Sequence, residues 1–405
     1  MRISPLVVAI ATLTACRGAD VAESLAPPSS AAPASQGLHG QATLADGQSI
    51  FRHDTFGDET FWTDTLRMHE VIASAVSPAT ALKVGLKVDA EALPEAVKHG
   101  ILDGTVDLNA PATTVTLLKL GAVVGVKGTV NESGSLTRVG ITCALCHSTV
   151  DNSFAPGIGS RLDGWPNRDL NVGAIVSLSP VLSDAQRAVY GSWGPGMYDP
   201  RFNIDGRNMP VVIPPAFGLR HVAREIYTGD GPVSYWNAYV AITQMHGHGH
   251  FVDPRIGVDI DNTPPDLVSS KLAALRAYQF SLEAPEPLRD SYDRDAAHRG
   301  RAVFNGVARC SSCHIAGNLS DVNTGVLHTP AEVGQDAEYA MRSATKLYRT
   351  TPLRGLWHPP QLQGLYFHDG KAKSLEAVVA HYEQLRGPKL TDRQRRDLVE
   401  YLKTL

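Results

Sequence analysis

The pentapeptides Cys143-Ala144-Leu145-Cys146-His147 and Cys310-Ser311-Ser312-Cys313-His314 decide the fold. A Cys-x-x-Cys-His run is the form that fastens haem covalently, because the two thiols form thioethers to the porphyrin and the adjacent imidazole becomes the proximal iron ligand. Zinc sites and redox dithiols also use Cys-x-x-Cys, but neither explains a histidine directly after both copies. We therefore predict two covalently bound c-type haems, held by Cys143, Cys146, Cys310 and Cys313 and ligated by His147 and His314.

The length and charge of the chain exclude few classes of protein. With 405 residues it is long enough for two or three domains, each with its own core. The formal net charge is −4, and 19% of the residues are charged. No basic stripe with interleaved aromatic residues is present, so we expect no nucleic-acid partner.

The first fifteen residues have the features of a secretion signal. Arg2 precedes an apolar segment, residues 3–13, that is too short to span a bilayer. The run Leu13-Thr14-Ala15-Cys16 resembles a bacterial lipobox, in which the signal is cut before the cysteine and the thiol is lipidated. The alternative is an ordinary signal peptide in which Cys16 has no role. We predict residues 1–15 as a signal peptide, residues 16–40 as a flexible tether, and a periplasmic or cell-envelope protein attached to a membrane by lipid alone.

Two similar stretches predict where each haem domain begins. Gly47-Gln48-Ser49-Ile50-Phe51 and Gly300-Arg301-Ala302-Val303-Phe304 each place an aromatic residue four positions after a glycine. In class I cytochrome c folds, such a pair on the first helix crosses the last helix. We predict a mainly α fold with two class I cytochrome c-like haem domains, at 41–285 and 286–405. We expect an insertion at about 56–137 or an N-terminal extension to enlarge the first domain; the alternative for this region is a separate N-terminal domain.

The middle of the chain gives weaker signals. Residues 113–127 are β-branched and punctuated by glycine, so helix and strand both remain open. The Gly/Pro/Trp-rich residues 154–235 predict a long loop around the first haem, with Arg161, Arg168 and Trp165 either near its propionates or serving as surface and packing groups. Residues 266–282 show the apolar spacing of a helix.

The last sixty residues give the clearest helix signals. Ser374 is a predicted N-cap for a helix whose apolar stripe includes Leu375, Val379 and Tyr382, so Tyr382 should point inward. Thr391-x-x-Gln394 is a predicted capping box for the final helix.

The motif Tyr366-Phe367-His368-Asp369-Gly370, together with Arg207-Asn208-Met209-Pro210, resembles the bacterial dihaem cytochrome c peroxidase and MauG superfamily. The long first domain is more similar to the relatives around rubber oxygenase than to the compact peroxidases. The resemblance implies that the C-terminal haem is six-coordinate and handles electrons, and that the N-terminal haem meets peroxide or oxygen.

The resemblance also implies a sixth ligand for the C-terminal haem, fourteen positions after the histidine of the Tyr-Phe-His-Asp-Gly motif. Tyr382 occupies that position; peroxidases have methionine there, and MauG-type members have tyrosine. A thioether raises the haem potential, whereas a tyrosinate stabilises oxidised iron. The alternative is that Tyr382 is a core aromatic and His381 or another side chain is the ligand.

On the distal side of the N-terminal haem, peroxidase members carry an acid–base glutamate. The corresponding segment here has no glutamate and offers His246, His248 and His250 instead. A histidine there can act as a base for peroxide or close the iron as a sixth ligand. An exposed Gly/His loop is the alternative for all three.

Two further features follow from the resemblance. An aromatic electron relay between the haems has Tyr227 or Trp236 as its nearest candidates, with simple packing as the alternative. A bridging calcium ion would use Asn208 and the backbone carbonyls of Gln363 and Leu365, because carbonyl oxygens are hard ligands whatever the side chain.

Three functions remain open from the sequence: a peroxidase-like or MauG-like oxidoreductase, a pure electron-transfer cytochrome, and an oxygenase of an apolar substrate. We prefer the hypothesis of a peroxidase-like or MauG-like oxidoreductase, with a small redox protein as electron donor and hydrogen peroxide or oxygen as oxidant. A homodimer is compatible with the sequence.

Overall fold

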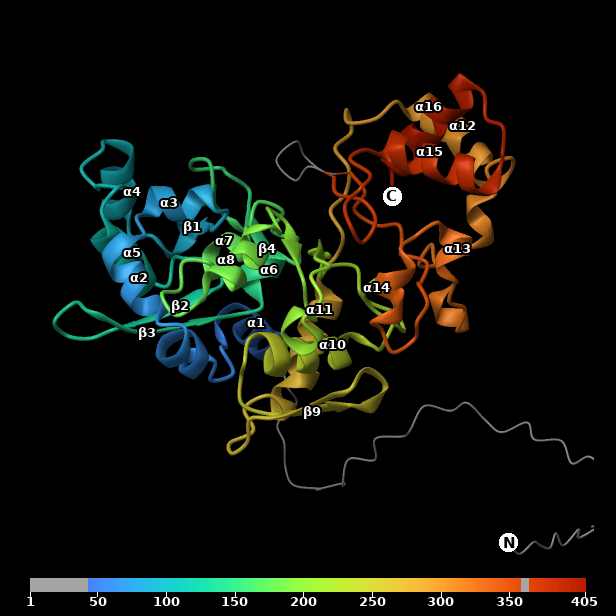
Figure 1. The fold of residues 1–405 in the computed structure, drawn as a ribbon. Helices are drawn as coiled ribbons and strands as arrows, with labels where there is room; N and C mark the ends of the chain where they lie inside the picture. Colours follow the sequence, from blue (N-terminus) through green and yellow to red (C-terminus); the bar gives the residue numbers. More distant parts are fainter. Residues whose placement is uncertain (1–42, 358–363) are drawn as a thin grey trace, which may run out of the picture. The chain divides into compact units, whose positions relative to one another are not determined.

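The computed structural model describes residues 43–357 and 364–405 (Figure 1). The predicted signal peptide, the tether with Cys16, and Gln363 lie outside these residues. Within the described part of the chain, no helix is both long and apolar enough to cross a membrane.

The N-terminal half is tied together by a close crossing of two helices, α1 (Leu44–His53) and α11 (Leu272–Ser281). A Cβ atom on Gly47 would overlap the carbonyl oxygen of Ala274, so only glycine allows this approach. Phe51 is fully buried, and its ring lies 5.6 Å from that of Tyr278 in a T-shaped arrangement. The helix begins at Leu272, later than the sequence pattern indicates, because residues 269–271 form a 3₁₀ turn.

The C-terminal half repeats this crossing with α12 (Arg294–Asn305) and α16 (Asp392–Leu402). Here a Cβ atom on Gly300 would overlap the carbonyl oxygen of Asp397. The rings of Phe304 and Tyr401 lie 5.2 Å apart. Both predicted glycine–aromatic pairs therefore lie where a first helix meets a last helix.

The predicted caps of the final two helices are confirmed. Ser374 accepts a hydrogen bond from the backbone N–H of Ala377 at the start of α15 (Leu375–Arg386). At the start of α16, Thr391 and Gln394 form the reciprocal capping box. Each cap satisfies N–H groups that the first turn of a helix leaves without partners.

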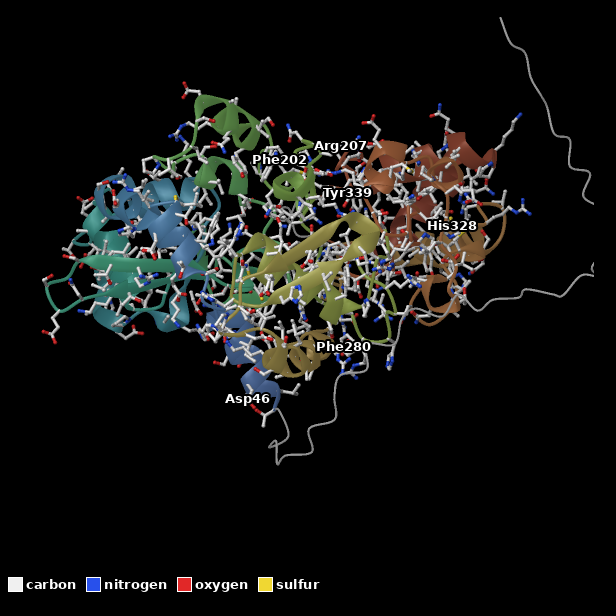
Figure 2. All side chains as sticks on the ribbon, turned by 60° about the horizontal axis from the view of Figure 1, so that its bottom comes forward. Asp46, Phe202, Arg207, Phe280, His328 and Tyr339 are labelled. Carbon is white, nitrogen blue, oxygen red and sulfur yellow. The ribbon has the colours of Figure 1, made fainter. Side chains whose placement is uncertain are left out.

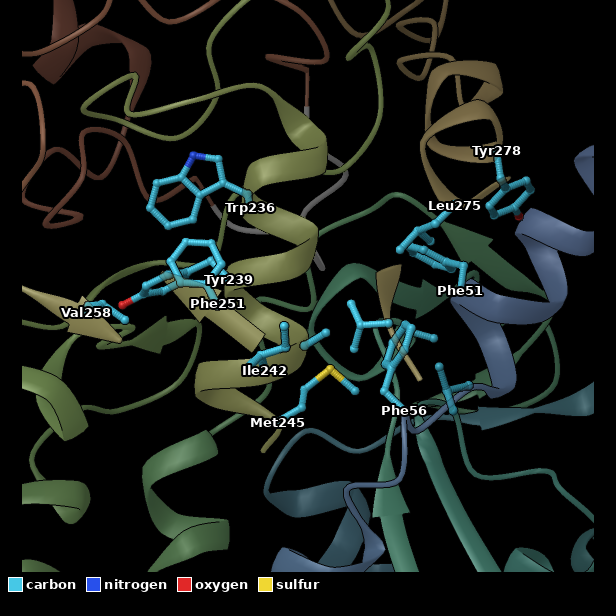
Figure 3. Packing of buried hydrophobic residues seen from close by; sticks show 14 of the residues in the cluster. Phe51, Phe56, Trp236, Tyr239, Ile242, Met245, Phe251, Val258, Leu275 and Tyr278 are labelled. Atoms are coloured by element: carbon cyan, nitrogen blue, oxygen red, sulfur yellow. The ribbon is translucent and has the colours of Figure 1, made fainter. Parts of the chain in front are cut away.

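The main apolar core of the first half surrounds α10 (Val233–Tyr239) and the π-helical turn Val240–Gln244 that continues it. Figure 3 shows Trp236 and Tyr239 beside Phe251, with Met245 facing Phe56 across the core. The core is therefore built from segments nearly two hundred residues apart in the chain.

Residues 60–130, which lie within the predicted insertion at about 56–137, form a lobe that is blue to cyan in Figure 1. That this lobe is inserted into a haem domain stays a prediction. Residues 113–127, for which helix and strand both remained open, contain the end of one helix and the start of one strand. The lobe comprises a π-helix (Thr60–Thr65), α2 (Met68–Ala75), α3 (Pro78–Lys83), β1 (Val88–Asp89), α4 (Glu95–Leu102), α5 (Pro111–Lys119) and β2 (Val126–Val130).

The strands of the described residues form small two-stranded pairs. β2 pairs with β3 (Leu136–Ile141), and β3 leads directly into the first haem motif and α6 (Ala144–His147). The other strands are β4 (Ser148–Val150), β5 (Ile158–Gly159), β6 (Arg161–Asp163), β7 (Met197–Tyr198), β8 (Val211–Val212), β9 (His250–Asp253) and β10 (Val258–Asp261). They pair as β1–β5, β4–β6, β7–β8 and β9–β10, of which only β1–β5 is parallel.

Short helices separate these strands and connect the two halves. They are α7 (Val172–Val176), α8 (Asp184–Gly191), α9 (Phe202–Asp205), α13 (Pro330–Val333) and α14 (Ala337–Met341). The fold is mainly α, as the sequence predicts. The predicted boundary at residue 286 stays a prediction, because residues 42–405 form one compact unit.

Candidate haem sites and their shared wall

The first Cys-x-x-Cys-His motif lies in the wall of a large apolar cavity, called here the first cavity. Cys143, Cys146 and His147 all line it. Nδ1 of His147 lies 3.0 Å from the carbonyl oxygen of Pro214; since a carbonyl only accepts, Nδ1 carries the proton. The Nε2 lone pair is then free for a metal. Burial lowers the pKa of His147 to about 4, which keeps the imidazole neutral.

The second motif has the same arrangement in a second cavity. Cys310, Cys313 and His314 line this second cavity, and Nδ1 of His314 donates to the carbonyl oxygen of Leu319 at 2.8 Å. Burial also lowers the pKa of His314. In both motifs a backbone carbonyl fixes the tautomer and orientation of the histidine, which is the arrangement a proximal ligand needs.

The thiols of the motifs are unpaired. None of the four described motif cysteines forms a disulfide. Burial raises the pKa of Cys143 and Cys146 to about 12 and that of Cys310 to about 11. Buried, protonated thiols in an apolar cavity do not suit a redox dithiol, which needs an accessible thiolate. The residues present fit covalent haem at both motifs.

A second grouping of metal-binding side chains lies beside the C-terminal motif. Ligand atoms of Cys313, Asp321 and His328 lie within 4.8 Å of one another. Nε2 of His328 already bonds Asp321 Oδ2 at 3.0 Å, and Cys313 belongs to the haem motif. This grouping therefore competes with haem attachment and does not fit a separate metal site.

The two cavities share part of their walls. The residues that line both are Cys143, His147, Pro214, Ile226, Tyr227, Trp236, Val240 and Met245. Tyr227 donates a hydrogen bond to the carbonyl oxygen of Val212 at 2.9 Å, whereas the buried Nε1 of Trp236 has no protein partner. Both aromatic residues predicted between the haems thus lie in this shared wall.

The three candidate distal histidines have different surroundings. His246 lines the first cavity and stacks on Phe61, with ring centroids 3.7 Å apart; burial lowers its pKa to about 4. His248 packs against Gly57 and is absent from the lining of this cavity. His250 lies on β9, is about half exposed, and bonds Asp259 at 2.9 Å. Among the three, only His246 faces the first haem motif.

The sequence reasoning missed two polar side chains in the same cavity, Tyr198 and Gln244. The Tyr198 hydroxyl donates to Oε1 of Gln244 at 2.7 Å, and Nε2 of Gln244 donates to Asn203 and Thr243. Burial raises the pKa of Tyr198 well above its usual value. The one available signal was a polar residue inside the apolar run 239–245. The network is neutral, so it supplies hydrogen bonds but no carboxylate base.

In the second cavity the structure separates the two candidate ligands on α15. Tyr382 lines the cavity together with Cys310 and His314, and burial raises its pKa to about 12. His381 instead directs Nε2 to the carbonyl oxygen of Val333 at 3.1 Å. Tyr382 thus lies on the cavity side of the helix, where the sequence predicts it.

The two arginines predicted near the propionates, Arg161 and Arg168, also differ in their contacts. Arg161 forms an ion pair with Asp89 at 3.1 Å. Arg168 lines the second cavity, its Nη1 is shielded from solvent without a hydrogen-bond partner, and no carboxylate of the described residues pairs with it. Trp165 packs its ring on Phe217 at 6.3 Å. Arg168 therefore offers an unused positive charge inside a haem cavity, which fits a propionate.

Two of the three predicted calcium ligands, Asn208 and Leu365, lie among the described residues, and the calcium site stays a prediction. Oδ1 of Asn208 accepts a hydrogen bond from Nε1 of Trp193 at 2.8 Å. The guanidinium of Arg342 donates to the carbonyl oxygen of Arg207 at 3.0 Å and lies 3.5 Å from that of Met209. The positively charged guanidinium of Arg342 therefore contacts the backbone carbonyls on both sides of Asn208. Leu365, whose backbone carbonyl is the predicted ligand, is among the residues that line the second cavity.

Arg342 joins segments that are far apart in the sequence. It lies just after α14 and forms ion pairs with Asp199 at 3.1 Å and Asp205 at 2.6 Å. Its side chain and that of Asp199 are almost completely buried. Arg207, labelled in Figure 2, adds an exposed ion pair with Glu338 of α14 at 3.7 Å. The loop after the first haem motif is thus fixed to the C-terminal half by a buried cation.

Parts of this chain are similar to known proteins. The cytochrome c family matches residues 297–405. The methylamine utilization protein MauG of Methylorubrum extorquens is 32% identical over 156 residues, which cover 33% of this chain and 43% of that protein. The chain therefore spans less than half of this relative's length. A hydrazine synthase structure from Kuenenia stuttgartiensis aligns over 53% of this chain and 74% of its own, with 18% identity and a TM-score of 0.32.

Proposed function

Residues 297–405 form a cytochrome c domain in a chain related to the MauG-like cytochromes, and from that premise we propose a dihaem c-type oxidoreductase. Electrons enter at the C-terminal haem, and peroxide or oxygen reacts at the N-terminal haem. The observation that carries the proposal is the pair of Cys-x-x-Cys-His motifs in cavities with a common wall. Bound haem supplies a redox-active iron at each motif.

The shared wall supports electron transfer between the two sites. Tyr227 and Trp236 each border both cavities, so either ring shortens the path through the protein. Tyr382 is the ligand expected to close the C-terminal site, which then exchanges electrons without binding substrate. His147 and His314 hold the proximal positions.

His246 is the proposed base for peroxide. Its imidazole lines the first cavity, and its pKa of about 4 leaves it neutral and able to accept a proton at ordinary pH. The Tyr198 hydroxyl donates its proton to Gln244, so its oxygen could accept a hydrogen bond from hydrogen peroxide in the cavity. The rate of peroxide consumption should stay level from pH 8 to about 5 and fall as the pH approaches the pKa of His246.

The test compares two single-histidine variants in holoprotein from a host that matures c-type cytochromes. His246→Ala should slow peroxide-dependent oxidation of a reduced donor by about 10²–10⁴-fold, the usual contribution of a general base. His250→Ala is the matched control, because His250 lies outside the first cavity, and should leave the rate unchanged.

Electron paramagnetic resonance of the oxidised protein decides between this function and pure electron transfer. A high-spin signal requires an open or weakly ligated iron and supports peroxide chemistry. Two low-spin haems that do not respond to peroxide would overturn the proposal in favour of electron transfer alone.

We also propose a location and partners for this activity. Export through residues 1–15 and lipid attachment at Cys16 would place the protein in the periplasm or cell envelope, where a small redox protein is the donor. Metabolic labelling with a radioactive fatty acid tests the anchor, since Cys16→Ser should abolish incorporation.

A further inference from the structure

The first cavity extends past the haem motif into the lobe. Its wall near the motif comes from the segments around His147, Tyr198 and His246. The rest comes from α2, α3 and α5, through Ile72, Ala81, Leu82, Leu117 and Leu118, and from Val76, which directly follows α2. We call this second part of the cavity the chamber.

Part of the chamber belongs to a different apolar core from the haem motif, although Ile72 also packs against the cluster that Cys146 contacts. Leu117 and Leu118 pack in a cluster with Val88 and Val123, whereas the motif cysteines contact two other clusters. This part of the chamber therefore lies beyond the side chains that surround the attachment site, in the predicted insertion.

The chamber wall is aliphatic, with few polar groups. The buried ammonium of Lys87 is already neutralised by Asp169 at 2.5 Å. The hydroxyl of Thr114 on α5 and Nε1 of Trp62 are buried in the cavity wall and have no protein hydrogen-bond partner. A buried hydroxyl left unpaired is costly, so a ligand that accepts its hydrogen bond gains affinity.

We propose that the chamber binds an aliphatic chain carrying one oxygen acceptor, such as an alcohol or an aldehyde. The chain packs on α2, α3 and α5, and its oxygen accepts from the Thr114 hydroxyl. Phe61 lies where the lobe reaches His246, so the bound molecule adjoins the proposed reactive side of the first cavity. The inference requires haem in the first cavity but not peroxide chemistry.

The experiment titrates oxidised holoprotein with 1-octanol and follows the Soret band and the heat of binding. We expect saturable binding at one site, and none with ethanol, which has the hydroxyl without the chain. Ala81→Phe should weaken octanol binding at least tenfold, because Ala81 on α3 is buried in the chamber wall. Ala79→Phe is the matched control, since Ala79 is exposed on the same helix.

A second variant tests the polar contact. Thr114→Val preserves the side-chain shape and should weaken octanol binding roughly twofold to tenfold, the effect of one hydrogen bond. If Ala81→Phe loses its haem or its helical signal, this variant decides the proposal. Non-saturable octanol binding, equal effects at positions 81 and 79, or unchanged affinity in Thr114→Val would overturn it. Peroxide consumption without octanol tests the proposed function separately.

Discussion

Arg168 differs from the other shielded arginines of the described residues in having no acidic partner. Arg161, Arg201, Arg342 and Arg349 pair with Asp89, Asp230, Asp199 and Glu225, respectively. A guanidinium shielded from solvent needs a counter-charge, because desolvation without one costs several kcal/mol. In a haem cavity the available anion is a propionate.

Arg168→Met should therefore lower the midpoint potential of one haem. A nearby positive charge disfavours oxidised iron, so its removal makes the iron easier to oxidise. Potentiometric titration of both haems measures the change, and Arg161→Met is the control, since Arg161 does not line either cavity. Two unchanged potentials in Arg168→Met would contradict the propionate contact.

Residue types and spacing predict the chemistry of the attachment sites but not their surroundings. The Cys-x-x-Cys-His runs identify the thiols and proximal histidines, because the chemistry requires them to be adjacent in sequence. The distal side is assembled from distant segments, so the sequence offers three histidines and cannot distinguish among them. Only the fold places His246 in the cavity and His250 near the surface.

At the scale of elements, the N-cap residues of α15 and α16 show which structural features local sequence can predict. Ser374 and Thr391 act as N-caps where the sequence predicts them, because capping depends on residues within one turn. The secondary structure of residues 113–127 could not be predicted from the sequence, because α5 ends and β2 begins within this segment. The early residues of 266–282 form a short 3₁₀ turn, although their apolar spacing is helical.

Thr391→Ala should lower the free energy of unfolding by about 1 kcal/mol, the usual loss when an N-cap oxygen is removed. Thr391 donates to and accepts from Gln394 in the capping box, and α16 carries the crossing with α12. Thr391→Ser keeps the oxygen and should be nearly neutral. Urea unfolding followed by far-ultraviolet circular dichroism compares the two, and an equal loss in both would rule out the cap as the cause.

At the scale of the whole molecule, buried arginines connect the two halves, as Arg342 and Arg349 do through Asp199 and Glu225. Arg342 lies 143 positions from Asp199 in the sequence, and no local pattern reveals their ion pair. The family resemblance predicts in addition a calcium ion next to Asn208, and that site stays a prediction. The buried ion pair of Arg342 and Asp199 is found only in the fold.

Arg342→Met should destabilise the protein by about 3–5 kcal/mol, because it leaves Asp199 buried without a counter-charge. Arg207→Met removes only an exposed ion pair and should cost less than about 1 kcal/mol. Chemical denaturation of the holoproteins gives both values.

Treatment of the wild-type protein with a calcium chelator should leave its stability and haem spectra unchanged. Chelator-induced unfolding that added calcium reverses would show that a metal, and not Arg342, holds the two halves together.

The paired glycine crossings have a practical consequence. Alanine at Gly300 would force α12 away from α16 and loosen only the C-terminal half, while alanine at Gly47 would loosen only the half built on α1 and α11. Each substitution should therefore change the absorbance of one haem and leave that of the other haem unchanged. Overlapping optical bands from two porphyrins in one polypeptide could then be assigned individually, without cutting the chain.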